Sequence, residues 1–293
     1  MAAAEARMSS PEDAFLDARK LLEKHGLRAK KHFGQNFLVA DRVFRAIVDA
    51  AVAADDDWIV EIGAGLGTLT ARLCERAHEG KIIAIERDPD MVAVLKAELG
   101  HLVDAETLQI EAMDAMRYDL HMAARWHGAP IVVCGNLPYH VASQLIFKAL
   151  DARADVSKIV VMVQREMADR ILAKPDTDAY GAMTAMIQMF ADVSMVAKVG
   201  AGAFVPPPKV DSAVVKITPL AQPRHPIADQ GHYSRVVHAA FGQRRKTLRN
   251  ALRAVFDAAI VDAGLQATQI DGQRRGETLT LAEFAALTGA IHA

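Results

Sequence analysis

The tetrapeptide Asn136-Leu137-Pro138-Tyr139 combines residue types that could activate an aromatic amine. The exocyclic amine of a nucleobase is a poor nucleophile, because its lone pair is delocalised into the ring. The Asn136 side chain and a backbone carbonyl near Leu137–Pro138 could accept the two amine hydrogens, and proline would fix the turn that aims this carbonyl. Tyr139 offers a face for base stacking, worth about 1–3 kcal/mol in single-strand binders. The alternative is an ordinary strand-ending turn, so a neighbouring cofactor site must decide.

A glycine-rich turn provides a candidate for that cofactor site. Residues 58–68 run from an apolar strand pattern into a turn and then into a helix. Dinucleotide-binding turns follow G-x-G-x-x-G and hold a pyrophosphate, whereas here the third glycine comes one residue early and Thr68 takes its place. Glu61, just before Gly63 and Gly65, repels phosphate and suits a cationic sulfonium ligand. The turn favours S-adenosyl-L-methionine over a nicotinamide dinucleotide, the cofactor of a dehydrogenase.

Acidic residues follow the next two predicted strands. Glu86 ends the run that begins at Lys81, about twenty residues beyond the glycines, where a ribose diol would bind. Asp114 follows the third strand and is placed to accept a hydrogen bond from the adenine amine of the cofactor. Either acid alone fits an ordinary strand end, but two at successive strand ends indicate a nucleoside site.

These segments together predict methyl transfer to a base amine. The rate gain would come from holding the amine nitrogen, the methyl carbon and the sulfur in line. No general base is required, because the methylated ammonium product is acidic enough to lose its proton to water.

Strand and helix patterns alternate over the first part of the chain. The predicted strands are 58–62, 81–85, 108–110, 131–134 and 159–163, and the predicted helices are 41–53, 68–76, 88–99, 142–150 and 166–173. This alternation predicts a mostly parallel sheet covered on both faces. Its ligand crevice should lie at the carboxyl ends of the first strands.

The pattern changes after Tyr180. One more buried helix is predicted near 183–190, and two strands follow, 193–199 and 213–218, which should pair antiparallel because no helix joins them. We expect the α/β class, with a Rossmann-like class I methyltransferase sheet that ends in an antiparallel hairpin. The expected domains are an N-terminal extension, 1–27, an S-adenosylmethionine-binding methyltransferase domain, 28–220, and a small all-α C-terminal domain, 226–293.

Composition narrows the class of protein. With 52% hydrophobic and 24% charged residues, the 293-residue chain should fold rather than stay disordered. The sequence shows neither a membrane-spanning stretch nor a targeting segment. Cys74 and Cys134 are too few for a disulfide framework or a zinc cluster. We therefore expect a cytoplasmic protein without a bound metal, and a monomer, since no heptad pattern or obvious apolar patch indicates an oligomer.

The net charge of −2 argues by itself against a nucleic-acid partner. Two basic clusters oppose this average. The first consists of Arg28, Lys30, Lys31 and His32, and the second of Arg244, Arg245, Lys246, Arg249 and Arg253. Such clusters are often solvated helix faces. If they flank the pocket, a flipped-out base could enter between them, and folded RNA would be recognised mostly by shape and backbone. We favour RNA contact for the second cluster.

Several further motifs follow one another in a recognisable order. They are Lys-Lys-His-Phe-Gly-Gln-Asn-Phe-Leu at 30–38, Glu-Ile-Gly-Ala-Gly-Leu-Gly at 61–67, the tetrapeptide at 136–139, Gln-Arg-Glu at 164–166, Tyr-Gly at 180–181, Phe-Val-Pro-Pro-Pro-Lys-Val-Asp-Ser at 204–212 and Phe-Gly-Gln-Arg-Arg-Lys-Thr-Leu at 241–248. In this set the sequence resembles the ribosomal RNA adenine dimethyltransferase family, in its bacterial small-subunit (16S) branch. The resemblance covers roughly residues 28–290.

This resemblance implies N6,N6-dimethylation of two adjacent adenosines near the 3′ end of 16S rRNA during small-subunit biogenesis. It also implies that Phe204 stacks on the target base opposite Tyr139. The cofactor contacts that it implies, with Gly65 added from the same turn, are Asn36, Leu38, Gly63, Gly65, Glu86, Asp114 and Asn136. Ala64 stands where the family commonly has proline, and residues 142–144 also depart from its pattern; these differences concern loop shape.

Two other functions are compatible with parts of this pattern. The first is a large-subunit rRNA adenine N6-methyltransferase of the macrolide-resistance type. The motifs at 31–35 and 241–246 favour the small-subunit enzyme over it. The second is a non-catalytic ribosome assembly or transcription factor that keeps the fold, and the intact motif at 136–139 argues against it.

Overall fold

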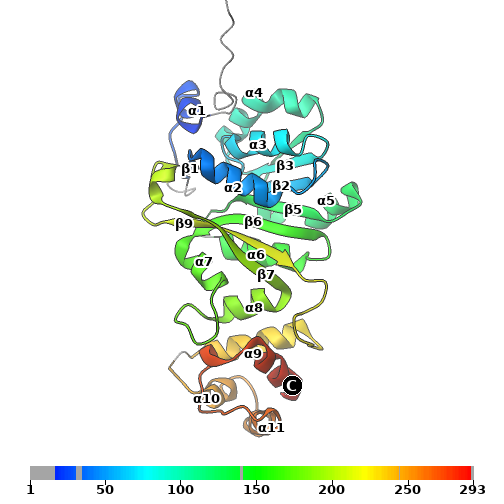
Figure 1. The fold of residues 1–293 in the computed structure, drawn as a ribbon, viewed down its shortest axis with the longest axis vertical. Coiled ribbons are helices and arrows are strands. Elements are labelled where there is room, and N and C mark those ends of the chain that lie inside the picture. Colours follow the sequence, from blue (N-terminus) through cyan, green and yellow to red (C-terminus); the bar gives the residue numbers. More distant parts are fainter. Residues whose placement is uncertain (1–16, 31–34, 139–140, 244, 292–293) are drawn as a thin grey trace, which may run out of the picture. The chain divides into compact units, whose positions relative to one another are not determined.

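A seven-stranded sheet forms the centre of the computed structural model, which describes residues 17–30, 35–138, 141–243 and 245–291 (Figure 1). Its strand order is β4-β3-β2-β5-β6-β9-β7. The strands are β2 (Trp58–Ile62), β3 (Lys81–Glu86), β4 (Leu108–Ala112), β5 (Ile131–Asn136), β6 (Val156–Gln164), β7 (Ala191–Val199) and β9 (Ser212–Pro219). The predicted α/β class is confirmed.

The first five strands pair in parallel, as the strand–helix alternation predicts. β2 pairs with β3 and β5, β3 pairs with β4, and β5 pairs with β6. The chain runs outward from β2 to β4 and then returns to place β5 on the other side of β2. Ligands of open α/β sheets bind where the strand order reverses in this way, so the topology points to the carboxyl ends of β2 and β5.

Helices follow most of these strands. In this part of the chain they are α1 (Ala18–Lys24), α2 (Asp41–Ala51), α3 (Thr68–Arg76), α4 (Pro89–Asp104), α5 (Leu120–His127) and α6 (Ala142–Asp151), with 3-10 turns η3 (Ala115–Arg117) and η4 (Ala201–Ala203). Ile59, Ile82 and Val132 pack into one core cluster with α2, α3 and α4. Their strand neighbours are equally buried, and because adjacent residues of a strand face opposite sides, both faces of the sheet are covered.

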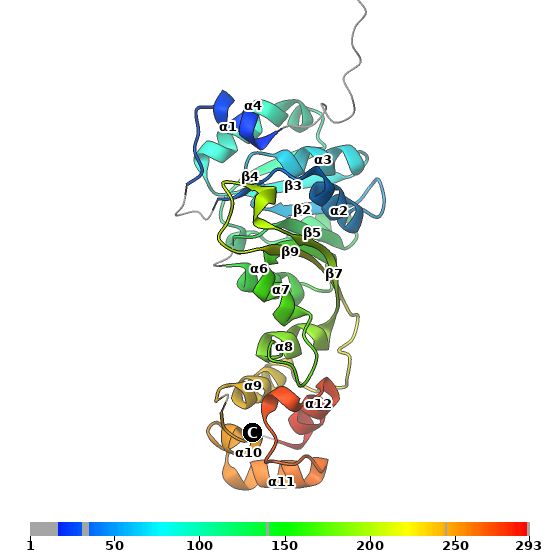
Figure 2. The ribbon, with the colours of Figure 1, turned by 60° about the vertical axis from the view of Figure 1, so that its left-hand side comes forward.

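Contacts divide the chain into two compact units. The first comprises the chain up to Gln164 together with Val196–Lys216, and the second comprises Arg165–Met195 together with Ile217–Ala293. The second unit contains α7 (Arg165–Ile171), α8 (Ala182–Phe190), α9 (Gln230–Phe241), α10 (Leu248–Arg253), α11 (Ala258–Thr268), η5 (Gly276–Thr278) and α12 (Leu281–Ala290). Figure 2 shows α9 to α12 gathered together.

The sequence placed residues 165–195 with the methyltransferase domain, whereas contacts group them with the C-terminal helices. Within the second unit the buried Tyr233 of α9 explains why. Its hydroxyl donates to the Ala185 carbonyl of α8 at 3.1 Å, and its ring meets that of Phe190 edge-on. Helical periodicity marks α8 as buried but does not reveal which element buries it.

Two elements near the sheet were not expected. α5 is short, with an Asp119 N-cap and Gly128 at its C-cap. α1 falls inside the predicted extension, 1–27, yet its Ala18 and Leu21 are buried. The described part of that segment is therefore packed structure. No helix among the described residues is long and apolar enough to cross a membrane.

A second small sheet lies beside the large one. β1 (Phe37–Leu38) pairs antiparallel with β8 (Phe204–Val205). β9 is the neighbour of β7, as the predicted hairpin requires. The short β8 precedes β9 and ties this loop to the N-terminal segment.

Gly135 provides a test of the close approach between β2 and β5. Its φ is +151°, and a Cβ there would lie 2.3 Å from the Ile62 carbonyl oxygen. We expect Gly135→Ala to lower the free energy of unfolding by at least about 2 kcal/mol, because β2 and β5 must separate. Chemical denaturation measures the change.

Gly100 of α4 provides the matched control, since its Cβ would enter open space. Gly100→Ala should stabilise the protein by roughly 0.5–1 kcal/mol through helix propensity. Equal stability changes in the two variants would contradict the close approach at Gly135.

Candidate active site

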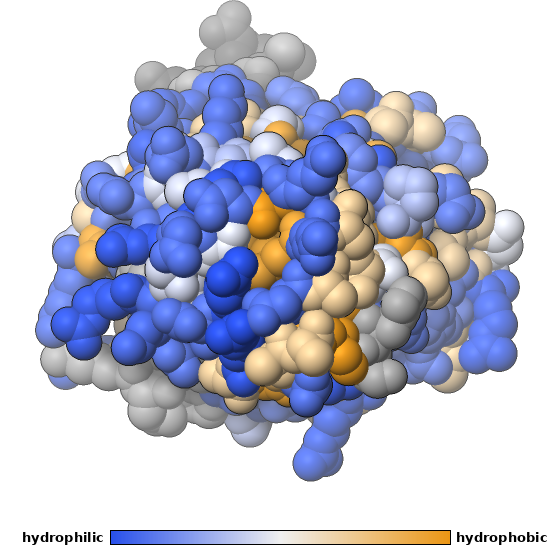
Figure 3. Space-filling view, turned by 90° about the horizontal axis from the view of Figure 1, so that it is seen from below, coloured by the Kyte–Doolittle hydropathy of each residue, from blue (hydrophilic) through white to orange (hydrophobic). Residues whose placement is uncertain are grey.

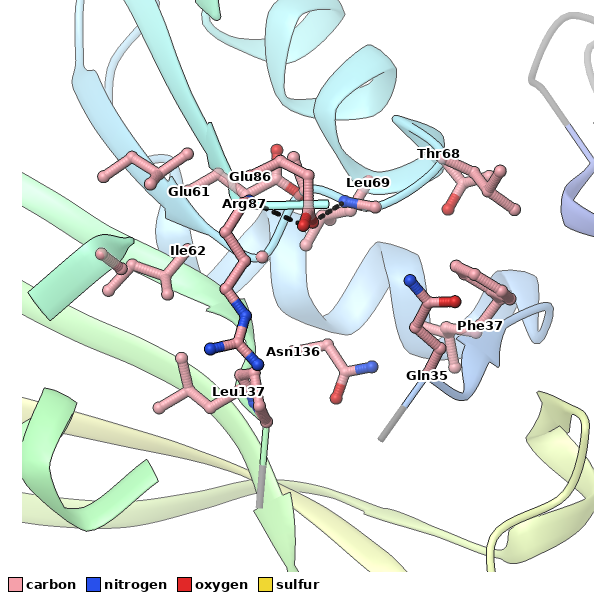
Figure 4. Close-up of a pocket in the computed structure, with 18 of the residues that line it drawn as sticks. Gln35, Phe37, Glu61, Ile62, Thr68, Leu69, Glu86, Arg87, Asn136 and Leu137 are labelled. Carbon is pink, nitrogen blue, oxygen red and sulfur yellow. Dashed lines mark hydrogen bonds between the residues drawn. The ribbon is translucent and has the colours of Figure 1, made fainter. Parts of the chain in front are cut away.

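A pocket opens at the carboxyl ends of β2, β3 and β5, where the strand order reverses (Figure 4). The predicted residues that line it are Asn36, Leu38, Gly63, Gly65, Glu86, Asp114, Asn136, Leu137 and Pro138. The structure thus brings the entire predicted cofactor set and three members of the catalytic tetrapeptide to one cavity. Tyr139 lies outside the described residues.

The glycine turn forms the wall of the pocket next to β3. Gly63 and Gly65 have φ values of +75° and +57°, which L side chains rarely adopt. The Gly63 and Ala64 N–H groups donate to the Ile85 carbonyl, at 2.9 and 3.3 Å. The turn is therefore fixed to the end of β3, and its backbone faces the ligand space without a side chain.

Glu86 is held at the end of β3 by backbone donors. Its Oε2 accepts from the Gly65 N–H at 2.9 Å, and its Oε1 accepts from the Arg87 and Asp88 N–H groups, both at 2.8 Å. A carboxylate has about four acceptor positions, so capacity for a diol is left. These bonds orient Glu86 before any ligand arrives.

Asp114 has a similar arrangement after β4. Its side chain accepts from the Met116 N–H at 2.9 Å and so caps η3. One oxygen thus fixes the side chain, and the carboxylate keeps capacity for a second donor. Asp114 and Glu86 line the same pocket from neighbouring strand ends.

Glu61 is a buried acid at the end of β2. It is 2% exposed, and the Thr70 hydroxyl donates to it at 2.6 Å. Burial raises the pKa of the Glu61 carboxyl to about 7, against the Thr70 hydrogen bond and with the help of the Glu86 charge. A positive ligand group nearby would favour the ionised form.

Asn136 ends β5 and connects to the N-terminal segment. Its side-chain nitrogen donates to the Asn36 carbonyl at 3.2 Å, which leaves its side-chain oxygen as an acceptor for the pocket. The Leu137 N–H donates to the Met162 carbonyl, and the Pro138 carbonyl accepts from the Val141 N–H, both at 3.1 Å. The turn is therefore fixed on both sides of the proline.

Comparisons with known proteins agree with this geometry. The family model for ribosomal RNA adenine dimethylase matches residues 26–290. The chain belongs to this family. Two relatives, both called ribosomal RNA small subunit methyltransferase A, come from Anaeromyxobacter sp. strain K and Myxococcus xanthus strain DK1622. The first is 44% identical, covering 94% of this chain and 98% of the relative, and the second is 41% identical, covering 97% and 96%.

Solved structures show the same fold. A dimethyladenosine transferase from Plasmodium falciparum is 25% identical with a TM-score of 0.70, covering 86% of this chain and 95% of its own. The 23S rRNA methyltransferase ErmE is 23% identical with a TM-score of 0.66, covering 87% and 99%. The chain is thus an enzyme of a methyltransferase family, with the Rossmann-like sheet that the sequence predicts.

The stacking role expected of Phe204 stays a prediction, and the ligand-free structure shows where its side chain lies. This side chain is 2% exposed and packs in the core cluster that contains Leu38 and Phe44. Pairing of β8 with β1 places Phe204 opposite Leu38, so its ring packs in the core of the ligand-free protein. The motif gave the residue but not its orientation.

The basic residues divide into three groups. Lys30 forms ion pairs with Asp88 and Asp90, both at 2.7 Å, so its charge is compensated within the chain. Arg249 lies 3.4 Å from Asp262, so its charge is partly compensated. Arg245 and Lys246 are exposed, as RNA contact requires. Lys31 and Arg244 lie outside the described residues.

The pocket also has lining residues to which the sequence assigned no role. Gln35 and Phe37 flank the predicted Asn36, and Arg87 follows Glu86. Figure 4 shows the Arg87 guanidinium pointing toward Leu137 across the pocket. The signal for the first two was present in the motif at 30–38, where they surround a predicted contact.

Glu61 generates a pH-dependent prediction. The pKa of Glu61 is about 7 in the folded protein, above the usual 4.5. The contribution of Glu61 to the free energy of unfolding therefore falls as the pH rises from 4.5 to 7, and it is constant above that range. Glu61→Gln removes this loss, so the variant should gain on wild type by up to roughly 3 kcal/mol as the pH rises from 4.5 to 8. Urea denaturation without cofactor across this range measures the gain. A stability difference independent of pH would refute the buried-acid assignment.

Proposed function

We propose that this chain uses S-adenosyl-L-methionine to dimethylate N6 of two adjacent adenosines near the 3′ end of 16S rRNA. The proposal depends on one observation: the residues predicted to bind the cofactor and those predicted to activate the base line the same pocket. The acidic strand ends, Glu86 and Asp114, line it together with Asn136 and Leu137 of the tetrapeptide. The names of the relatives support the small ribosomal subunit as the target.

The donor groups of the pocket fit this cofactor. The oriented Glu86 carboxylate suits a ribose diol, and Asp114 suits an adenine amine. Glu61 places negative charge beneath the glycine turn, where it attracts a sulfonium or an ammonium group. S-adenosyl-L-methionine would supply the methyl group, and Glu86, Asp114 and Glu61 would hold it in this pocket.

Asn136 and Leu137 would activate the base. With its side-chain nitrogen bonded to Asn36, Asn136 directs its oxygen at one amine hydrogen. The Leu137 carbonyl is the better second acceptor, because the Pro138 carbonyl already accepts from Val141. Two acceptors aimed at the amine localise its lone pair on nitrogen and align it for transfer. Tyr139 supplies the stacking face that its place in the motif implies.

Recognition of RNA would involve the second unit. Figure 3 shows one face of the molecule, on which hydrophilic residues surround a band of hydrophobic ones. The exposed Arg245 and Lys246 precede α10. We assign them to phosphate contacts with 16S rRNA in the small subunit, bound by a monomer of this chain.

The first experiment identifies the product and the target. Immature small subunits and protein-free large-subunit RNA are each incubated with the protein and the cofactor, and their adenosines are analysed by mass spectrometry. Dimethyladenosine in the small-subunit RNA alone is the expected result. Modification of large-subunit RNA alone would establish the macrolide-resistance type of activity instead, and no methylation of either would leave only a binding role.

Asn136→Ala tests the activation of the base. We expect methyl transfer to fall by roughly 100-fold in kcat, a loss comparable to that of a single oxyanion-hole donor. Asn250→Ala, at an exposed position of α10, is the control and should methylate normally. Unchanged turnover in Asn136→Ala would exclude the proposed mechanism.

Arg245→Ala and Lys246→Ala test the RNA contacts. Each should weaken RNA binding and reduce the slope of log affinity against log salt by about one. Lys96→Ala is the control, since Lys96 is exposed on α4 of the first unit. A salt slope unchanged in both variants would remove these residues from the interface.

A further inference from the structure

Asp88 is a fully buried acid that the chemistry proposed above does not use. It is 0% exposed and stands at the N-cap of α4, where it accepts from the Asp90 N–H at 3.1 Å. A helix cap needs one acceptor and no burial, since exposed Asp119 serves α5 in the same way. Complete burial of Asp88 therefore calls for a second explanation.

That explanation lies in the N-terminal segment. The Lys30 ammonium donates to Asp88 Oδ1 at 2.7 Å, and the Gln35 side-chain amide donates to Asp88 Oδ2 at 2.7 Å. Lys30 and Gln35 are also bonded to each other, because the Lys30 N–H donates to Gln35 Oε1 at 2.8 Å. The two carboxylate oxygens thus bind one residue each of this bonded pair.

The charge of Asp88 is well compensated in this position. Burial alone would raise the pKa of its carboxyl, but the hydrogen bonds from Lys30, the Asp90 backbone and Gln35 outweigh burial and hold that pKa below its usual value. Asp88 is ionised in the folded protein, so its bonds to Lys30 and Gln35 are charge-assisted and comparatively strong.

The segment fixed in this way forms a wall of the cofactor pocket. Gln35, Asn36, Phe37 and Leu38 all line the pocket, and Figure 4 shows Gln35 and Phe37 across it from Leu137. A Cβ at Gly65 would lie 3.5 Å from the Phe37 ring, so this ring covers the glycine turn. The Asn36 carbonyl receives the Asn136 amide.

Asp88 also connects to the ribose end of the site. Its N–H donates to Glu86 Oε1, at 2.8 Å. One residue therefore joins the acid assigned to the ribose to the segment that closes the opposite side of the pocket. Packing supports the same segment from behind, where Phe37 shares a cluster with Leu21 of α1 and Met91 of α4.

We propose that Asp88 is a positioning residue, which fastens Lys30 and the segment from Gln35 to Leu38 to the start of α4 and so forms the cofactor-binding wall. It touches neither the methyl group nor the base, and it acts through Gln35, Asn36 and Phe37. The proposal rests on the proposed function for the identity of the ligand, while the fastening itself is a property of the chain.

Asp88→Asn tests this role with little damage to the helix, because asparagine caps helices as well as aspartate does. The variant loses the charge that pairs with Lys30 and one of its two acceptor oxygens. We expect the KM and the Kd for S-adenosyl-L-methionine to rise about tenfold, with kcat changed by less than about twofold, because the lost bonds are charge-assisted and act on binding.

Hydrogen exchange provides a readout that does not require the cofactor. In the ligand-free protein, Asp88→Asn should speed amide exchange in residues 35–39, where the Val39 N–H bonds to the Ala203 carbonyl. Exchange in the central strands β2 and β5 should stay as in wild type. Uniformly faster exchange, at the sheet as well, would identify Asp88 as a general stability determinant and overturn the proposal.

Three further variants provide the controls. Asp119→Asn removes the charge of another helix cap and should leave cofactor affinity unchanged. Asp90→Asn should have a small effect, since the Asp90 side chain is 49% exposed. Lys30→Met should reproduce the Asp88→Asn phenotype, and the double variant should be no worse than either single one.

The outcomes distinguish the two proposals. If wild type binds no S-adenosyl-L-methionine, the proposed function fails, and the exchange experiment still decides the fastening. If wild type binds it and Asp88→Asn matches wild type in Kd and in exchange at 35–39, the positioning role is excluded. If the losses of cofactor affinity were additive in the double variant, the Lys30–Asp88 contact would be excluded as the basis of the positioning role.

Discussion

Three carboxylates line one pocket, a fourth, Asp88, bonds to Gln35 of its wall, and the site depends on how the charge of each is compensated before a ligand binds. Glu86 accepts three backbone N–H groups, Asp114 caps a 3-10 turn, and Asp88 is paired with Lys30. Glu61 has only the Thr70 hydroxyl and a raised pKa. Fixed backbone donors orient an acid permanently, whereas the poorly compensated Glu61 gains most from a positive ligand. The pocket is therefore organised to receive a cationic nucleoside without first rearranging its acids.

The parallel sheet makes this concentration of acids possible. Carboxyl ends of neighbouring parallel strands meet at one edge, so residues far apart in sequence reach one cavity. The reversal of strand order between β2 and β5 leaves that edge open, and Gly135 lets the two strands approach closely enough for Asn136 to face the glycine turn. The N-terminal segment then supplies the remaining wall through the Asn36–Asn136 hydrogen bond. In the proposed mechanism, base activation and cofactor binding share this bond, which is why Asn136 belongs to both predicted sets.

Much of the fold was predictable, because strand and helix periods are local properties. The strands at 58–62 and 81–85 and the helix at 68–76 were located to within a residue or two. The family resemblance predicted the cofactor set, and all of its members line one pocket. α5 was missed because its eight residues carry only a short apolar face. The grouping of α7 and α8 with the C-terminal helices was missed because it depends on long-range contacts such as that of Tyr233 with Ala185.

The sequence by itself determined which residue types are available at each strand end and in what order the motifs follow, since these are properties of the chain. Only the tertiary structure decided which way the Phe204 ring points and which residue compensates the charge of Lys30. Both outcomes depend on partners distant in sequence. The pairing of β8 with β1 turns the Phe204 ring into the core, and the start of α4 brings a buried carboxylate to Lys30. A basic or aromatic residue in a motif has several possible roles, and the neighbour that burial brings to it selects one of them.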